Sequence, residues 1–141
     1  MVNQTAAKKH PLRDFPLTGT PTVAIDLDDT LVEYDGWHGY QHIGPLRPGA
    51  RKALQRFKNA GWIIVLHTTR ADISRIWEWI DDAVPGLIDH VNSNPASIQM
   101  RCNPGKPIAD LYIDDRAWPY CGNPIPWEKL LDDLNQRGIL A

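Results

Sequence analysis

Two short clusters of aspartates are the residues in this sequence best suited to chemistry. They are Asp26-Leu27-Asp28-Asp29 and Asp114-Asp115, in a chain that contains 14 Asp but 3 Glu. Neighbouring carboxylates repel one another, so each raises the cost of ionising the next. A bound cation relieves this repulsion, and oxygen-only ligands favour a hard ion. Mg²⁺ is the commonest hard ion that binds through one or two carboxylates together with a substrate phosphate.

Groups that stabilise phosphate accompany these aspartates. Thr68 and Thr69 offer hydroxyl groups, and Lys106 supplies positive charge shortly before the second aspartate cluster. Carboxylates, Mg²⁺, a lysine and a threonine together describe a phosphoryl-transfer site, where positioning and charge stabilisation provide most of the catalysis. We expect Arg70 to contact phosphate or substrate, although a surface ion pair explains this residue equally well.

The elements that must position these residues alternate between strands and helices. Short apolar runs predict strands at 22–27, 62–68 and 109–113, with a weaker one at 88–93. Helical spacing of apolar residues predicts helices at 50–60, 72–83 and 127–138, and residues 94–107 are expected to form a loop. This alternation favours an α/β fold with a parallel sheet and helices on both faces. Ligands of such sheets bind at the carboxyl ends of the strands, where the candidate residues lie.

The tryptophans of the two later helices indicate which faces are buried. Trp77 continues the spacing of Ile73, Ile76 and Ile80, so we expect it in the core. Trp79 falls on another face and is expected at the periphery or in an oligomer contact. Trp127 is expected in the core.

Four segments resemble the motifs of the haloacid dehalogenase superfamily. The segment Val23-Ala24-Ile25-Asp26-Leu27-Asp28-Asp29-Thr30-Leu31 resembles the first motif, hhhDxDxT, and Leu66-His67-Thr68-Thr69-Arg70 resembles the second. Gly105-Lys106-Pro107 resembles the third, and Leu111-Tyr112-Ile113-Asp114-Asp115 resembles the fourth. The segments occur in the family's order and span residues 23–115, which is most of the chain.

The resemblance implies a three-layer αβα, Rossmann-like domain with a mainly parallel sheet, and a role for each matching residue. Asp26 would attack phosphorus to give an aspartyl-phosphate. Asp28 would first protonate the leaving oxygen and then activate water. Thr68 and Lys106 would bind the phosphoryl oxygens.

The resemblance also implies the metal ligands. Mg²⁺ would bind Asp26, the backbone carbonyl of Asp28, and Asp114. Asp115 would bind it directly or through water. Thr30 would support the loop behind Asp26 rather than react.

The spacing between motifs leaves no room for the cap domain that many phosphatases of this family carry. We expect a leader at 1–20 and a single catalytic domain at 21–141, with a flap formed by residues 31–46. We expect Trp37, His38 and Tyr40 of the flap to be available to contact substrate. The open site would accept a large substrate, or be closed by the flap or by a neighbouring subunit in a homo-oligomer.

Composition narrows the choice of partners and location. The net charge of −2 and the pI near 6.2 argue against general electrostatic capture of nucleic acid. No apolar run approaches the roughly 20 residues of a membrane span. Cys102 and Cys121 are not spaced as a redox motif, so a cytoplasmic protein with two thiols is expected. A nucleotide or a small phosphorylated metabolite is the expected substrate, and a polynucleotide end also fits an open site.

Two other functions use similar residues. Receiver domains of response regulators place acids, a threonine and a lysine around Mg²⁺, but their lysine comes last, whereas Lys106 precedes the final acidic pair. The other alternative is a scaffold of the same fold that binds a nucleotide or a partner with little turnover. Intact motifs favour the hydrolase over both.

Overall fold

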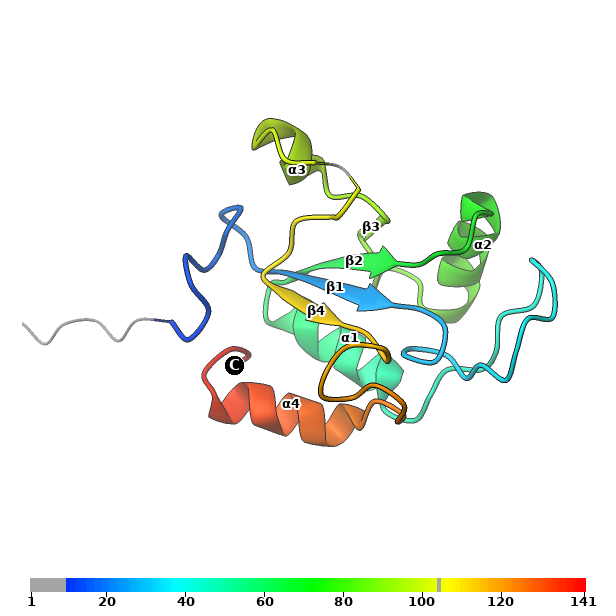
Figure 1. Ribbon diagram of the computed structural model, residues 1–141. Coiled ribbons are helices and arrows are strands. Elements are labelled where there is room, and N and C mark those ends of the chain that lie inside the picture. The colour runs from blue at the N-terminus through cyan, green and yellow to red at the C-terminus, as the bar shows by residue number, and fades with distance from the viewer. Residues whose placement is uncertain (1–9, 104) are drawn as a thin grey trace, which may run out of the picture.

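The sheet is formed by four parallel strands. The computed structural model describes residues 10–103 and 105–141. Its strands are β1 (Thr22–Asp26), β2 (Ile63–His67), β3 (His90–Val91) and β4 (Leu111–Ile113), in the order β3-β2-β1-β4. All three strand pairings are parallel, so the carboxyl ends of the strands meet at one end of the sheet (Figure 1). The predicted α/β fold with a parallel, Rossmann-like sheet is confirmed.

Four helices connect and flank these strands: α1 (Ala50–Asn59), α2 (Ile73–Ala83), α3 (Pro95–Gln99) and α4 (Trp127–Gln136). The side chain of Asp72 caps α2 by accepting a hydrogen bond from the backbone N–H of Arg75. Helix α3 corrects the prediction of a continuous loop at 94–107. Asn94 caps α3 and Pro95 occupies its first turn, a start signal that the Asn- and Pro-rich composition concealed.

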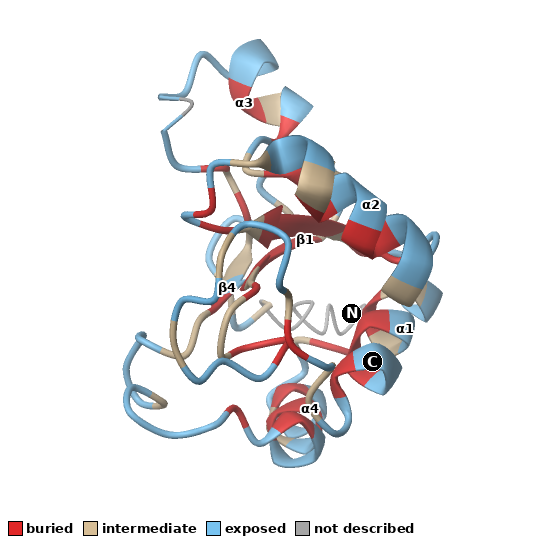
Figure 2. Ribbon diagram, turned by 90° about the vertical axis from the view of Figure 1, so that its right-hand side faces the viewer, coloured by how far each residue is buried: buried red, intermediate tan, exposed pale blue. Residues whose placement is uncertain are grey.

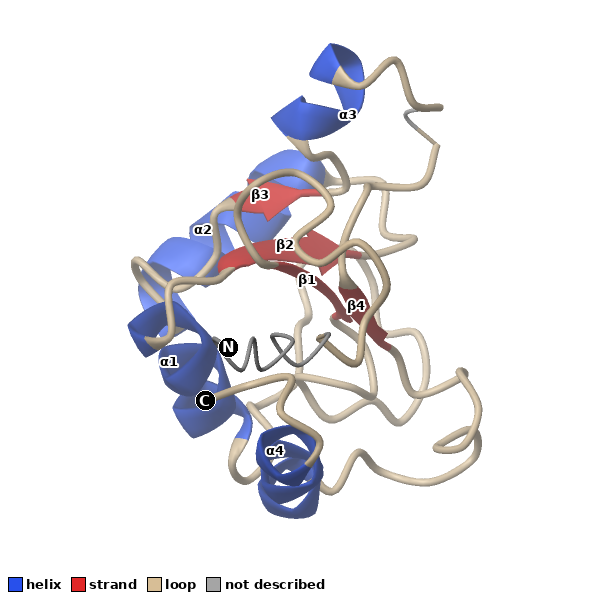
Figure 3. Ribbon diagram, turned by 90° about the vertical axis from the view of Figure 1, so that its left-hand side faces the viewer, coloured by secondary structure: helices blue, strands red, loops and turns tan. Residues whose placement is uncertain are grey.

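The main core lies on one face of the sheet. It combines alternate residues of the strands, such as Val23, Ile25 and Ile64, with the apolar sides of α1, α2 and α4. Figure 2 shows buried residues along one side of these helices, and Figure 3 shows the helices on the same side of the sheet. The opposite face carries a small core of Ala24, Val65 and Ala109. The chain that leads into β4, which includes the short helix α3, covers this second face, where helices had also been expected.

The tryptophans of α2 are placed in the opposite way from the sequence prediction. Trp79 is 6% exposed, whereas Trp77 is 36% exposed, so the prediction of Trp77 as the core residue was wrong. The buried side of α2 runs through Ile76, Trp79 and Ile80, which are spaced by three and four residues. Ile73 is exposed like Trp77, so the apolar pattern mixed two sides of the helix. Trp127 is buried, as predicted.

The flap, residues 31–46, is a loop with a closed neck. The backbone N–H of Glu33 donates to the carbonyl of Pro45 at 2.9 Å, and that of Arg47 donates to the carbonyl of Leu31 at 2.8 Å. Gly44 lies in this neck, and a Cβ built on it would run into the carbonyl oxygen of Glu33. The neck therefore requires glycine at this position, and it holds the two ends of the flap together.

The C-terminus lies at the far end of the sheet from the carboxyl ends of the strands (Figure 1). Leu140 is buried, and the Nε of Arg56, in the last turn of α1, donates to the carbonyl of Ala141 at 3.0 Å.

The segment before β1 packs against the body of the molecule. Phe15 contacts Trp62 through their rings, and the backbone N–H of Leu17 donates to Asp110 at 2.8 Å. Residues 1–9 of the leader expected at 1–20 lie outside the described residues. None of the described helices has the length and apolar character that a membrane crossing needs.

Candidate functional site

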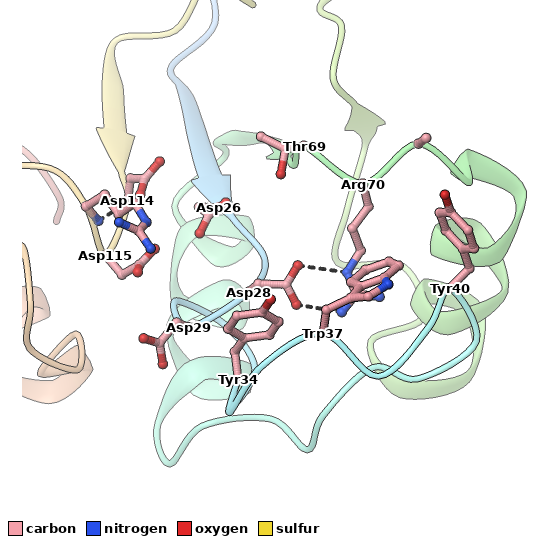
Figure 4. Close-up of a pocket in the computed structure, with 12 residues that line it drawn as sticks. Asp26, Asp28, Asp29, Tyr34, Trp37, Tyr40, Thr69, Arg70, Asp114 and Asp115 are labelled. Carbon is pink, nitrogen blue, oxygen red and sulfur yellow. Dashed lines mark hydrogen bonds and ion pairs between the residues drawn. The ribbon is translucent and has the colours of Figure 1, made fainter.

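Three carboxylates meet where β1 and β4 end. Asp26 is the last residue of β1, and Asp114 and Asp115 follow β4, which pairs with β1 in parallel. Each of the three offers an oxygen, and these oxygens lie within 4.8 Å of one another. Figure 4 shows the side chains of all three gathered at these strand ends. Such an oxygen donor set fits a hard divalent cation, so these residues could hold a metal ion such as Mg²⁺.

The electrostatics of Asp26 agree with a cation-binding role. Burial, the hydrogen bond with Asp115 and the charge of Asp114 together raise the pKa of Asp26 from 3.8 to about 8. The Thr30 hydroxyl lies 3.0 Å from Asp26 Oδ2 and 3.2 Å from Asp115 Oδ1, and it accepts a hydrogen bond from the backbone N–H of Asp115. A bound cation would supply the positive charge that this crowded group lacks.

Asp28 faces away from the other carboxylates and pairs with Arg70. The Nε and one terminal nitrogen of Arg70 each donate to a different oxygen of Asp28 at 2.7 Å (Figure 4). The remaining terminal nitrogen donates to the flap carbonyl of His42 at 2.8 Å. The Arg70 side chain is 6% exposed, so the ion pair is buried rather than a surface contact. The hydrogen bonds to Asp28 raise the pKa of Arg70 above its usual value.

The two threonines at the end of β2 differ in position. Thr69 lines the cavity next to the aspartates. Thr68 is buried, and its hydroxyl accepts a hydrogen bond from the backbone N–H of Arg70 at 3.1 Å. The backbone N–H of Thr68 donates to Asn92 at 2.7 Å, which fixes the turn that carries Arg70.

Lys106 and His38 do not line this cavity. The exposed Lys106 places its ammonium 4.6 Å from the centre of the Tyr112 ring, on the second face of the sheet. Tyr112 in turn donates to the carbonyl of Pro107 at 2.7 Å, which holds this part of the chain over β4. His38 pairs with Asp35 at the flap surface, at 2.8 Å.

The cavity beside the carboxylates has a volume of about 480 Å³. It joins the strand ends to the flap, and most of the candidate residues line it. Tyr34 also lines the cavity and was not predicted as a site residue, although the aromatic residues of the flap were a visible signal. The lining residues are Asp26, Asp28, Asp29, Tyr34, Trp37, Tyr40, Thr69, Arg70, Ala71, Asp114, Asp115 and Arg116.

Comparison with known proteins gives one structural likeness. No family model matches the chain, and no curated protein matches it. A solved structure, that of the conserved protein coded by locus from Bacteroides thetaiotaomicron, is 27% identical to it. The match covers 84% of this chain and 92% of the other, with a TM-score of 0.64. The likeness supports the α/β fold described above.

Proposed function

We propose that this chain is a Mg²⁺-dependent phosphomonoester hydrolase that acts through an aspartyl-phosphate on Asp26. The observation that carries this proposal is the meeting of Asp26, Asp114 and Asp115 at the ends of two paired strands. Asp28 follows Asp26 by two residues and lines the same cavity. The proposal is also supported by the resemblance of these segments to the motifs of the haloacid dehalogenase superfamily, which occur in the same order along the chain.

The proposed reaction proceeds in two displacements. A carboxylate oxygen of Asp26 attacks phosphorus, the bond from phosphorus to the leaving oxygen breaks, and Asp28 donates a proton to that oxygen. Asp28 then takes a proton from water, whose oxygen attacks phosphorus and displaces the Asp26 carboxylate. The products are an alcohol and inorganic phosphate. Mg²⁺, when bound by Asp26, Asp114 and Asp115, would offset the negative charge of the carboxylates and the phosphoryl group.

In the proposed cycle, Asp28 would alternate between a state paired with Arg70 and a state released from it. As a carboxylate, Asp28 accepts both hydrogen bonds from Arg70. As a protonated acid it no longer needs that partner, and the guanidinium is then free to pair with a phosphoryl oxygen while the His42 carbonyl still holds it. Because Lys106 does not line the cavity, Arg70 and Arg116 are the lining cations in this proposal.

The proposal is tested by phosphate release from a panel of phosphomonoesters, with Mg²⁺ and with a chelator. The wild type should release phosphate only with Mg²⁺. Asp26→Asn should lower the rate by roughly a thousandfold or more, because the nucleophile is lost. Asp35→Asn is the matched control, since Asp35 pairs with His38 outside the cavity lining and its replacement should leave the rate nearly unchanged. Equal release by the wild type and Asp26→Asn on every ester would refute the hydrolase.

The Asp28–Arg70 ion pair favours a second candidate function. Both oxygens of Asp28 accept hydrogen bonds from Arg70 in this structure, so neither is free to contact a leaving group. The chain would then bind a phosphorylated ligand with Mg²⁺ and turn it over slowly. Saturable, Mg²⁺-dependent binding by calorimetry without phosphate release would favour this scaffold over the hydrolase.

A further inference from the structure

Three aromatic side chains of the flap face the same cavity as the carboxylates. Tyr34, Trp37 and Tyr40 line it, and all three are exposed. Figure 4 shows Trp37 and Tyr40 on the side of the cavity away from Asp114 and Asp115. Large aromatic groups clustered in the solvent at the mouth of a polar cavity mark a binding surface rather than a core.

The rings are held in position by their own contacts and by the flap backbone. The rings of Trp37 and Tyr40 meet edge to face with their centres 5.1 Å apart, and the Arg70 guanidinium lies 5.3 Å from the centre of the Trp37 ring. Arg70 and Arg75 donate to two successive flap carbonyls, those of His42 and Gln41. The flap therefore presents an arranged aromatic surface next to the strand ends.

The charge of the cavity limits how many phosphates a ligand can carry into it. Five lining residues are aspartates and two are arginines, and Arg47 pairs with the lining Asp29 from outside the cavity. With every acid ionised, these residues carry a formal charge of −2, which one Mg²⁺ would neutralise. No net positive charge then remains for a second phosphate, so the lining favours one phosphate on an otherwise uncharged group.

The cavity is larger than a phosphate group requires. Its volume of about 480 Å³ lies within the range of sites for small organic ligands. The space between the carboxylates and the flap rings is thus available to the leaving group.

From these observations we infer that the substrate is a nucleoside monophosphate whose base stacks on the flap rings, with Trp37 as the specificity-determining residue. The hydrolysis in this inference rests on the function proposed above, whereas the stacking does not. Stacking on an aromatic ring tolerates every base, so the inference applies to the class and not to one nucleotide.

The test compares kcat/KM with Mg²⁺ for adenosine 5′-monophosphate and ribose 5-phosphate, which differ in the base. We expect the nucleotide to be preferred by roughly tenfold or more, an effect typical of one base–aromatic stack. Adenosine 3′,5′-bisphosphate, with its second phosphate, should be a poorer substrate than the monophosphate. Trp37→Leu should lower kcat/KM for the nucleotide much more than for ribose 5-phosphate, so that most of the preference is lost. Trp118→Leu is the control, because Trp118 is 87% exposed and does not line the cavity.

Several outcomes would overturn the inference while the hydrolase stands. They are equal kcat/KM for the nucleotide and ribose 5-phosphate, an equal loss on both substrates in Trp37→Leu, or a tenfold preference for a 5′-phosphorylated oligonucleotide. If no ester releases phosphate, the hydrolase proposal fails. The stacking of a base on Trp37 is then tested by calorimetric binding of adenosine to the wild type and to Trp37→Leu. Tighter binding by the wild type than by Trp37→Leu would support it, and equal binding, or none, would overturn it.

Discussion

The donors of the Arg70 guanidinium are divided between the Asp28 carboxylate and the His42 carbonyl of the flap. One side chain therefore sets the position of the candidate acid and that of the flap together. A lysine could not replace this pattern, because its single ammonium cannot present a planar pair of donors to a carboxylate.

Replacing Arg70 with alanine should destabilise the protein and lower its activity together. The loss leaves Asp28, whose side chain is 23% exposed, without its partner. We expect the free energy of unfolding to fall by about 3 kcal/mol, the lower end for breaking a buried ion pair, because Asp28 keeps some contact with water. Urea unfolding measures this change.

Arg75→Ala provides the comparison for Arg70→Ala. Arg75 also donates to a flap carbonyl, that of Gln41, but its pairing with Glu78 spans 3.9 Å at an exposed position. Its loss should cost less than about 1 kcal/mol. Equal destabilisation by the two substitutions would show that Arg70 acts as a flap tether alone.

At the scale of elements, the flap depends on its neck. The antiparallel contact between Val32 and Leu46 joins the two ends of the flap, and Gly44 allows the two segments of the neck to lie close to each other. The aromatic residues lie beyond this neck, so their arrangement depends on Gly44, which has no side chain.

Gly44→Ala should open the neck, because the added methyl group collides with the Glu33 carbonyl. We expect faster chymotryptic cleavage of the flap and loss of hydrogen-exchange protection at the Glu33 amide, which donates to Pro45. Gly39→Ala is the control in the same flap: its φ of 93° makes alanine strained, but nothing lies within 4 Å of the added atom. Unchanged protection of the Glu33 amide in Gly44→Ala would contradict this account of the neck.

At the scale of the whole molecule, the raised pKa of Asp26 links stability to pH. The pKa of Asp26 is about 8 in the folded state, whereas an unperturbed aspartate of the unfolded chain releases its proton near pH 3.8. Between these values the folded state binds more protons, so the stability that Asp26 contributes is present at low pH and is lost as pH rises through this window.

From pH 5 to pH 8, with a chelator present, the free energy of unfolding should therefore fall more in the wild type than in Asp26→Asn. Denaturant unfolding of both proteins measures this difference. Mg²⁺ binds the ionised carboxylates, so its stabilising effect on the wild type should be larger at pH 8 than at pH 5. Parallel pH profiles for the two proteins would show that Asp26 does not carry the shift.

The sequence allows those parts of the candidate site to be predicted that follow from local sequence patterns. Asp26 and Asp114 each follow an apolar run, and parallel pairing of those runs brings them together without further information. The first two helices also follow from their apolar spacing and from start signals such as Asp72.

The remaining features depend on contacts that local pattern does not encode. The pairing of Asp28 with Arg70 joins two loops 42 residues apart, and no spacing rule anticipates it. The position of Lys106 depends on the path that the chain takes from α3 to β4, where the Tyr112 hydroxyl donates to the carbonyl of Pro107. The buried side of α2 was ambiguous, because Trp77 and Trp79 are equally apolar and only packing distinguishes them.

The opposite positions of the C-terminus and the cavity make the molecule convenient to attach to a surface. Ala141 lies at the end of the sheet away from the strand ends that carry Asp26 and Asp114 (Figure 1). A short linker added after Ala141 would therefore fix the protein to a sensor chip or a bead with the cavity directed toward the solution. Such an orientation suits biosensor measurements of nucleotide capture, since every immobilised molecule would present the same open face.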